Sequence, residues 1–162
     1  MSDTRTTKNN SGDDGTVFDP LKTNYTPVGE RMPDGTLYAG LSPDTGRPMY
    51  VLACDIPLGM TWKQAMEYAA NLEGSAVNGA NHPKGTFRLP TRNELTAMLE
   101  HRDKIGGFGE NGSLATGWYW SSTLPRKQPH PRQDFGWAAR YDDDRRGWYM
   151  QALPLSARLV RS

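Results

Sequence analysis

The sequence predicts an α+β fold with a largely antiparallel sheet. Two observations lead to this prediction: short strand-like runs separated by turn residues stand near both ends of the chain, and two capped helical segments lie between them. Strands followed by helices and then by further strands are typical of α+β proteins rather than of alternating α/β folds. Seventeen glycines and twelve prolines in 162 residues favour turns and short strands over a helix bundle.

One folded domain and an N-terminal arm are expected from length and composition. Residues 1–24 consist mainly of Ser, Thr, Asn, Asp, Gly and Lys, which is typical of disorder, and their first apolar cluster is Val17 with Phe18. Alternatively, the arm orders against a neighbouring subunit and uses Val17, Phe18 and Leu21 as anchors. Residues 25–162 are numerous enough to bury the core of a single domain.

A β-hairpin is predicted at the start of this domain. Residues 36–41 and 47–53 are rich in strand formers, and the five residues between them read SPDTG. Proline near the start of a turn, followed by Asp and Gly, is typical of a hairpin loop. A further turn, PDG, stands just before the first strand.

Two helices follow, and each begins with a capping box. Thr61 with Gln64, and Thr91 with Glu94, match the pattern in which a Thr side chain caps the helix while a Glu or Gln three residues later bonds back to it. Apolar residues at helical spacing follow each cap. The second helix is expected to end before Gly106.

Four more short strands, at residues 117–122, 136–141, 147–151 and 157–161, complete the predicted sheet. Residues 116–149 hold four of the five tryptophans in the chain. Large aromatic side chains are enriched both in cores and where a protein binds another molecule, so these aromatics need to be divided between the two roles.

Strand alternation divides the aromatic residues. Trp118 and Trp120 share one face of their strand, which we assign to the core, so that Tyr119 is expected to point outward. Trp148 and Tyr149 are adjacent and point to opposite faces, so one of them is expected to be exposed. The residues assigned to structural roles are Trp62, Arg88, Trp118, Trp120 and Trp137, with Arg88 expected to tie loop carbonyls or a carboxylate together.

A binding surface is expected among the late loops. The loop at residues 124–132 carries three prolines, and a loop stiffened in advance loses less entropy on binding. The turn at residues 142–146 is either a solvated turn with local ion pairs or a charged rim beside the aromatic residues. The candidate ligand-binding residues are Tyr119, Arg126, Lys127, Gln128, His130, Arg132, Tyr141, Asp142, Asp144, Arg145, Arg146, Trp148 and Tyr149.

Patterns that carry catalysis or metal binding are absent from the sequence. Cys54 is the single cysteine, which excludes an intrachain disulfide and a CxxC knuckle. His82, His101 and His130 are scattered, with no spacing typical of a nucleophile or of metal ligands. We therefore expect no enzymatic activity, no cofactor and no metal; an enzyme of unknown type is the least favoured alternative.

Charge and hydropathy restrict the partners. A net charge of +1 gives no electrostatic basis for binding nucleic acid. The mean hydropathy is −0.74 and residues 1–15 contain no apolar run, so we expect neither a signal peptide nor insertion into a membrane. A role outside the cell then needs another route, such as release in a phage particle; a cytoplasmic location or non-Sec export is the alternative.

A series of short motifs resembles a known family. The motifs are FRLPT at 87–91, NEL at 93–95, GGF at 106–108, WYWSS at 118–122, WA at 137–138 and ARLVR at 157–161. In this order and without large gaps they resemble the C-terminal domain of collagen-like bacterial adhesins, and the related C-type-lectin-like proteins that phages and bacteria diversify through retroelements. The resemblance covers about residues 30–161.

This resemblance implies a C-type-lectin-like fold: two helices beside a twisted, mostly antiparallel sheet, with the chain ends close together and ligands bound by the late strands and loops. Positions that vary in such relatives correspond to roughly residues 123–156. At Phe87 the family usually has tryptophan, a conservative departure. Gln128-Pro-His130 stands in place of the Glu-Pro-Asn or Gln-Pro-Asp motif of calcium-dependent lectins, and histidine is a poor calcium ligand.

These observations together predict a non-enzymatic binding or assembly module on a phage virion surface, as a tail-fibre, collar or decoration protein. Its expected partners are virion subunits, bound through the N-terminal arm, and a cell-surface receptor or glycan; a homo-oligomer is plausible for such a protein. The main alternative is an adhesin-like bacterial protein that binds a carbohydrate or polyanion through Arg126, Lys127, Arg132, Arg145 and Arg146.

Overall fold

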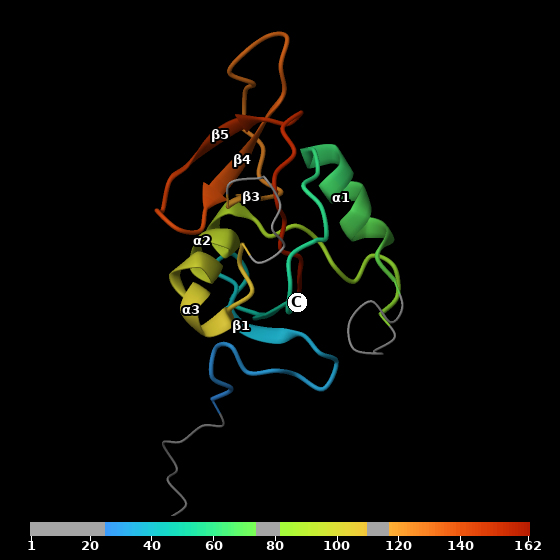
Figure 1. Cartoon of the computed structure of the whole chain (residues 1–162), viewed down its shortest axis with the longest axis vertical. Coiled ribbons are helices and arrows are strands. Elements are labelled where there is room, and N and C mark those ends of the chain that lie inside the picture. Colours follow the sequence, from blue (N-terminus) through green and yellow to red (C-terminus); the bar gives the residue numbers. More distant parts are fainter. Residues whose placement is uncertain (1–24, 74–81, 110–116) are drawn as a thin grey trace, which may run out of the picture.

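Two small antiparallel sheets and three helices make up the part of the chain that the structure describes, residues 25–73, 82–109 and 117–162 of a computed structural model (Figure 1). The α+β class predicted from the sequence is therefore confirmed. The arm at residues 1–24 lies outside the described residues, as do residues 74–81 and 110–116.

The first sheet joins the two ends of the domain. It has the order β1-β2-β6, with β1 at Leu37–Leu41, β2 at Pro48–Val51 and β6 at Val160–Arg161. β1 and β2 form the predicted hairpin, closed by the Ser42 N–H bond to the Arg47 carbonyl (2.8 Å) and by Gly46 at a φ of 69°, which favours glycine. β6 pairs with β2, so the C-terminal strand lies against the N-terminal hairpin.

The second sheet carries the late strands. Its order is β3-β4-β5, with β3 at Trp118–Trp120, β4 at Phe135–Arg140 and β5 at Arg146–Met150. Ser156 links it to the rest of the fold, because its carbonyl accepts from the Trp120 N–H (3.0 Å) and its N–H donates to the Trp118 carbonyl (2.9 Å). β5 is the edge strand of this sheet.

The helices are α1 at Trp62–Asn71, α2 at Arg92–Glu100 and α3 at Arg102–Ile105. Both predicted capping boxes are confirmed: Thr61 accepts from the Gln64 N–H and Thr91 from the Glu94 N–H, each at 3.2 Å. The second predicted helix is interrupted at His101, whose backbone (φ −108°, ψ 19°) leaves the helical range and separates α2 from α3.

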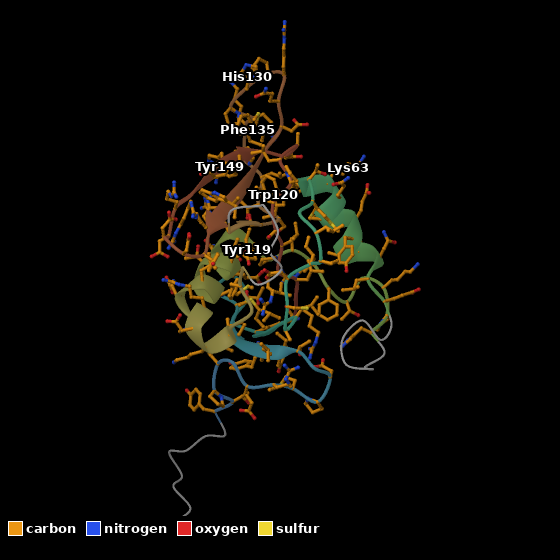
Figure 2. All side chains as sticks on the ribbon, viewed as in Figure 1. Lys63, Tyr119, Trp120, His130, Phe135 and Tyr149 are labelled. Carbon is orange, nitrogen blue, oxygen red and sulfur yellow. The ribbon has the colours of Figure 1, made fainter. Side chains whose placement is uncertain are left out.

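Two apolar clusters lie on opposite faces of β3 and β4. One contains Tyr119, Trp137 and the inner side of α2; the other contains Trp120 and the inner side of α1. Tyr119 and Trp120 are both 0% exposed, and Figure 2 places them in the middle of the molecule. The prediction that Tyr119 points outward is therefore wrong: alternation sends it away from Trp120, but α2 and the first sheet cover that face as well.

The other tryptophans with predicted structural roles are buried or half-buried. Trp137 is buried, and Trp118 is half-buried at the margin of the second cluster, where its ring lies 4.3 Å from that of Tyr149. Trp62 is also half-buried and donates from Nε1 to the Ser121 carbonyl (2.8 Å). This bond joins the start of α1 to the end of β3.

Arg88 has the predicted structural role. Its Nη1 and Nη2 donate to the Glu94 carboxylate at 2.6 and 2.9 Å, and Nη1 also reaches the Leu89 carbonyl (3.3 Å). The same carboxylate accepts from Ser42 Oγ (2.7 Å). Burial alone would raise the pKa of Glu94, but the bonds from Arg88, Ser42 and the Thr91 N–H outweigh it, and the pKa lies below its ordinary value.

A second buried ion pair crosses the centre of the fold. Arg158 is 0% exposed and donates to Asp55 (3.2 Å), to the Leu52 carbonyl (2.5 Å) and to the Gly106 carbonyl (2.9 Å). The Tyr119 hydroxyl donates to the other oxygen of Asp55 (2.5 Å). Burial raises the pKa of Asp55 and of Tyr119, and the nearby Asp55 carboxylate raises that of Tyr119 further.

Candidate ligand-binding surface

An open groove runs between the start of α2 and the edge strand β5. It consists of two hollows of about 480 and 450 Å³ that adjoin at Arg92 and Asn93, which line both. We call it the α2–β5 groove. Its other lining residues are Pro43, Asp44, Thr91, Thr96, Ala97 and Glu100 on one side, and Thr123, Leu124, Pro125, Arg126, Trp137, Arg146 and Trp148 on the other.

Main-chain and side-chain bonds fix the walls of the groove. The Ser122 N–H donates to the Pro90 carbonyl (2.8 Å), and the Arg92 N–H donates to Thr123 Oγ1 (2.9 Å), which holds the segment after β3 against the start of α2. Asp44, in the hairpin loop, accepts from the Thr91 hydroxyl and from Asn93 Nδ2 (2.7 Å). Three segments distant in sequence thus meet here in a fixed arrangement.

Two apolar side chains stand exposed at this groove. β5 alternates between half-buried and exposed residues: Tyr149 packs on Trp118, while Trp148 is 37% exposed. Leu124 is 44% exposed and lines the same hollow as Trp148. The prediction that one of Trp148 and Tyr149 is exposed is confirmed. Exposed tryptophan beside aliphatic side chains is the composition of an interface anchor.

Three arginines surround these apolar groups. Arg92, Arg126 and Arg146 are exposed and line the groove, and no carboxylate among the described residues lies within ion-pair distance of them. Arg146 makes only long contacts, to the Asp144 carbonyl (3.3 Å) and to Thr96 Oγ1 (3.4 Å). The five donors of each guanidinium are therefore largely free to recognise a carboxylate, sulfate or phosphate.

The charged turn between β4 and β5 is mostly occupied by its own ion pairs. Arg140 donates to Asp142 (2.7 Å), Arg145 donates to Asp143 (2.5 Å), and Arg102 lies 3.7 Å from Asp144. The hydrogen bond from Arg140 holds the pKa of Asp142 below its ordinary value. Of the candidate residues in this turn, Asp142, Asp144 and Arg145 thus serve local structure, whereas Arg146 faces the groove.

The loop between β3 and β4 projects from the top of the molecule in Figure 1, with His130 near its tip in Figure 2. Gln128 is turned inward: its Oε1 accepts from the Phe135 N–H (2.7 Å). His130 Nδ1 accepts from the Arg132 N–H (3.2 Å), so it too supports the loop. Lys127 and Arg132 are exposed, but they do not line the groove.

Two predicted contact residues lie away from the groove. Tyr119 is fully buried, as described above, and Tyr141 is half-buried, with its ring against Gly109 and Gly117. A Cβ at Gly117 would lie 2.6 Å from that ring, and its φ of 73° also favours glycine. The Tyr141 ring therefore packs against Gly109, which follows α3, and Gly117, which precedes β3, rather than facing a ligand across the groove.

The structure brings together Arg126, Arg146 and Trp148 among the predicted binding residues. Sequence reasoning missed Asp44, Arg92 and Asn93, and it included Leu124 in the expected binding loop without naming it as a contact residue. Arg92 and Asn93 follow the helix cap at Thr91, and such positions are commonly exposed, but only the tertiary contact with residues 122–123 shows what they face.

A larger hollow, of about 510 Å³, lies along the outer side of α1 and is lined by Leu58, Met60, Tyr68 and neighbouring residues. It contains Glu67 but no cationic side chain, and the ammonium group of Lys63 on the same helix lies 3.9 Å from the Glu67 carboxylate. The α2–β5 groove is the stronger candidate because it combines an exposed tryptophan with unpaired arginines.

Metal-holding groups and membrane-crossing helices are both absent from residues 25–73, 82–109 and 117–162. No three His, Cys, Asp or Glu side chains there gather in a way that would hold a metal ion. None of the helices in those residues has the length and apolar character needed to cross a membrane.

No protein-family model matches the chain, and no curated protein is significantly similar to it in sequence. The groove has therefore to be interpreted from its own chemistry.

Proposed function

We propose that the protein is a non-enzymatic binding and assembly module of the C-type-lectin-like class, carried on the surface of a phage particle, and that the α2–β5 groove is its binding surface. The observation that carries the binding role is the exposure of Trp148 and Leu124 among three arginines without a described ion-pair partner. Aromatic and arginine side chains are the residues that contribute most to binding energy at protein interfaces.

The arrangement of the elements supports the lectin-like assignment. The C-terminal strand β6 pairs with the N-terminal hairpin, two longer helices flank the sheets, and the late strands β4 and β5 carry the exposed groove. Each of these features was expected from the motifs between residues 87 and 161. The virion placement rests on the same motif resemblance.

A test begins with the particles released by the strain that encodes the chain. Gradient-purified particles should contain the protein, as measured by quantitative mass spectrometry. Trp148→Ala particles should either lose the protein, which indicates an assembly contact, or keep it and adsorb poorly to host cells, which indicates a receptor contact. Lys63→Ala, on the exposed face of α1, is the matched control and should change neither quantity. Absence of the protein from particles would refute the virion placement.

The unpaired arginines favour one second candidate, a protein that binds an anionic glycan. Three guanidinium groups around one groove would attract sulfate or carboxylate groups, and such binding weakens steeply as salt screens it. Heparin is a suitable probe. Retention that falls sharply between low and high salt, and that is lost in the triple variant Arg92→Ala, Arg126→Ala and Arg146→Ala, would show that the groove binds an anionic glycan. If purified particles also lack the protein, this candidate is favoured over the virion role.

A further inference from the structure

The edge of β5 is open along the α2–β5 groove. β5 is the last strand of the order β3-β4-β5, so one side of its backbone has no strand partner among the described residues. The Gln151 N–H donates to the Asp134 main-chain carbonyl (2.8 Å), and the Arg140 N–H donates to the Arg145 carbonyl (2.7 Å). Between these two hydrogen bonds, Trp137 of β4 lies opposite Trp148 of β5.

In an antiparallel pair the residues that bond across to the partner strand alternate with those that do not. The residues of β5 that hydrogen-bond to β4 are therefore the odd-numbered ones. The main-chain N–H and C=O groups of the even-numbered Arg146 and Trp148 point to the open side of the strand. An extended segment can bond to such an edge and add a strand to the sheet. A natural protein that leaves an edge open in this way beside exposed apolar groups offers a place for such a segment.

The side chains along this edge define what kind of segment fits. Arg92, Arg126 and Arg146 supply positive charge. The lining also contains Asp44, which is bonded to Thr91 and Asn93, and the exposed Glu100, so the guanidinium groups outnumber the carboxylates. Trp148 with Leu124 supplies an apolar anchor site. The complementary segment is extended, acidic and carries two or three apolar side chains. A sequence of this kind occurs within the chain itself, in the residues that precede the described domain.

Residues 13–21 read DDGTVFDPL: three aspartates, no basic residue, and the apolar side chains Val17, Phe18 and Leu21. Thr16, Val17 and Phe18 are strand formers, and proline occurs only near the end, where it does not prevent pairing of the preceding residues. Three carboxylates match the three unpaired guanidinium groups in number, and the aromatic Phe18 matches the Trp148–Leu124 anchor site.

The position of this segment favours the groove of another copy. The described chain begins at residue 25, below β1 in Figure 1, whereas β5 lies towards the upper end of the molecule. Leu21 is only four residues before that point, which a fully extended chain spans in about 14 Å. A segment so close to the lower end reaches a groove on a neighbouring molecule more readily than the one on its own.

We propose that residues 13–21 of one copy bind the α2–β5 groove of a second copy, by adding a strand to the open edge of β5. This inference rests on the proposed function, since it names the neighbouring subunit that the binding surface contacts. A reciprocal exchange gives a closed dimer, and a cyclic exchange gives a closed ring of more copies.

Complementation between two full-length variants tests the proposal. The arm variant carries Asp13→Asn, Asp14→Asn, Asp19→Asn and Phe18→Ala; the groove variant carries Trp148→Ala and Arg126→Glu. Analytical ultracentrifugation should show concentration-dependent association of the wild type, weakened about tenfold or more in each variant alone. A mixture of the two variants should associate more strongly than either variant alone, because the intact arm of the groove variant meets the intact groove of the arm variant, which restores one of the two exchanged contacts. Circular dichroism checks that both remain folded.

Three results would overturn the inference: a wild type that stays monomeric, variants that associate as the wild type does, or a mixture that associates no more strongly than either variant alone although each variant is folded. Lys63→Ala is the control and should associate as the wild type does. Failure here is distinguishable from failure of the proposed function, because adsorption of particles to cells can still depend on Trp148 when the purified protein shows no self-association.

Discussion

Arg158 shows how one buried charge organises a small fold. Its guanidinium joins Asp55, the Leu52 carbonyl and the Gly106 carbonyl, and lies 4.8 Å from the ring centre of Phe108. A planar group with five donors in fixed directions is suited to such a junction, whereas lysine is not. The junction ties the segment after β2, the end of α3 and the approach to β6 to one point.

Replacing this arginine should therefore destabilise the protein strongly. Arg158→Met leaves the Asp55 carboxylate buried without its ion-pair partner, and breaking a buried pair in this way costs about 3–5 kcal/mol. Urea unfolding at neutral pH measures the loss. The double variant Arg158→Met, Asp55→Asn should recover part of it, since no charge is then left uncompensated. A loss below about 1 kcal/mol in the single variant would contradict the account.

Glu94 makes the stability depend on pH at the acidic end. Its folded-state pKa lies below the ordinary 4.5, so the carboxylate form stabilises the fold above that pH, and the contribution is lost as pH falls through the lower, folded-state value. Asp34 acts in the same direction: burial opposes the shift, but bonds from Thr36 and Arg161 lower its pKa as well. Through these two groups the free energy of unfolding should decline as the pH falls below about 4.5, whereas Asp55, whose pKa is raised by burial, contributes in the opposite direction.

Glu94→Gln should remove part of this dependence. The amide keeps an acceptor for the Thr91 N–H but loses the charge that faces Arg88, at a cost of about 1–3 kcal/mol at pH 7. Unfolding by urea at several pH values between 3 and 7 should show a smaller decline in the variant than in the wild type. Glu100→Gln, exposed on the same helix, is the control. Equal declines in wild type and Glu94→Gln would contradict the assignment.

At the scale of the elements, the two helix caps differ in what else they hold. Thr61 caps α1 and makes no further side-chain bond that the structure describes, whereas Thr91 caps α2 and also donates its hydroxyl to Asp44. Asp44 in turn holds Asn93, which lines the groove. The cap of α2 is therefore also part of the wall of the binding surface.

Removing each cap should separate these roles. Thr61→Ala should cost about 1 kcal/mol through the lost cap bond. Thr91→Ala should cost more, because it also releases the Asp44 side chain. Urea unfolding of both variants in parallel gives the comparison. An equal or smaller loss in Thr91→Ala would show that the bond to Asp44 contributes nothing to stability.

Local patterns predicted most of these elements. The hairpin loop and both capping boxes depend on residues within five positions of one another, so their chemistry is readable in the sequence. Local patterns did not predict that both faces of β3 are buried. Alternation correctly separates Tyr119 from Trp120, but whether a second layer covers the Tyr119 side depends on α2 and on the first sheet. The break at His101 was missed because the apolar pattern continues across it to Ile105.

At the scale of the whole molecule, the groove is a product of tertiary structure. Its walls come from the hairpin loop, the start of α2, the segment after β3 and strand β5, which are far apart in sequence. The sequence identified Trp148, Arg126 and Arg146 because aromatic and basic residues in late loops are unusual enough to notice. Arg92 and Leu124 carried no such signal, since their importance comes from what lies opposite them.

In the late loops, some of the predicted binding residues stabilise the fold, whereas others are free to bind a partner. Five of the predicted binding residues already have an intramolecular partner for their polar or aromatic group: Gln128, His130, Tyr141, Asp142 and Arg145. Lys127 and Arg132 remain exposed in the loop between β3 and β4, away from the groove. Along the groove itself, the open backbone of β5 and the exposed Trp148 lie together with three arginines that have no ion-pair partner among the described residues. That concentration is the basis for assigning binding to the groove.

Photo-cross-linking in intact particles tests this claim most directly. Benzoylphenylalanine replaces Trp148 in one variant and Lys63, on the outer face of α1, in a matched one; particles are irradiated before and during contact with host cells, and adducts are identified by mass spectrometry. Adducts are expected from position 148, either to residues 13–21 of another copy or to a cell-surface molecule, and none are expected from position 63. Adducts from position 63 alone, or from neither position in particles that contain the protein, would contradict this claim.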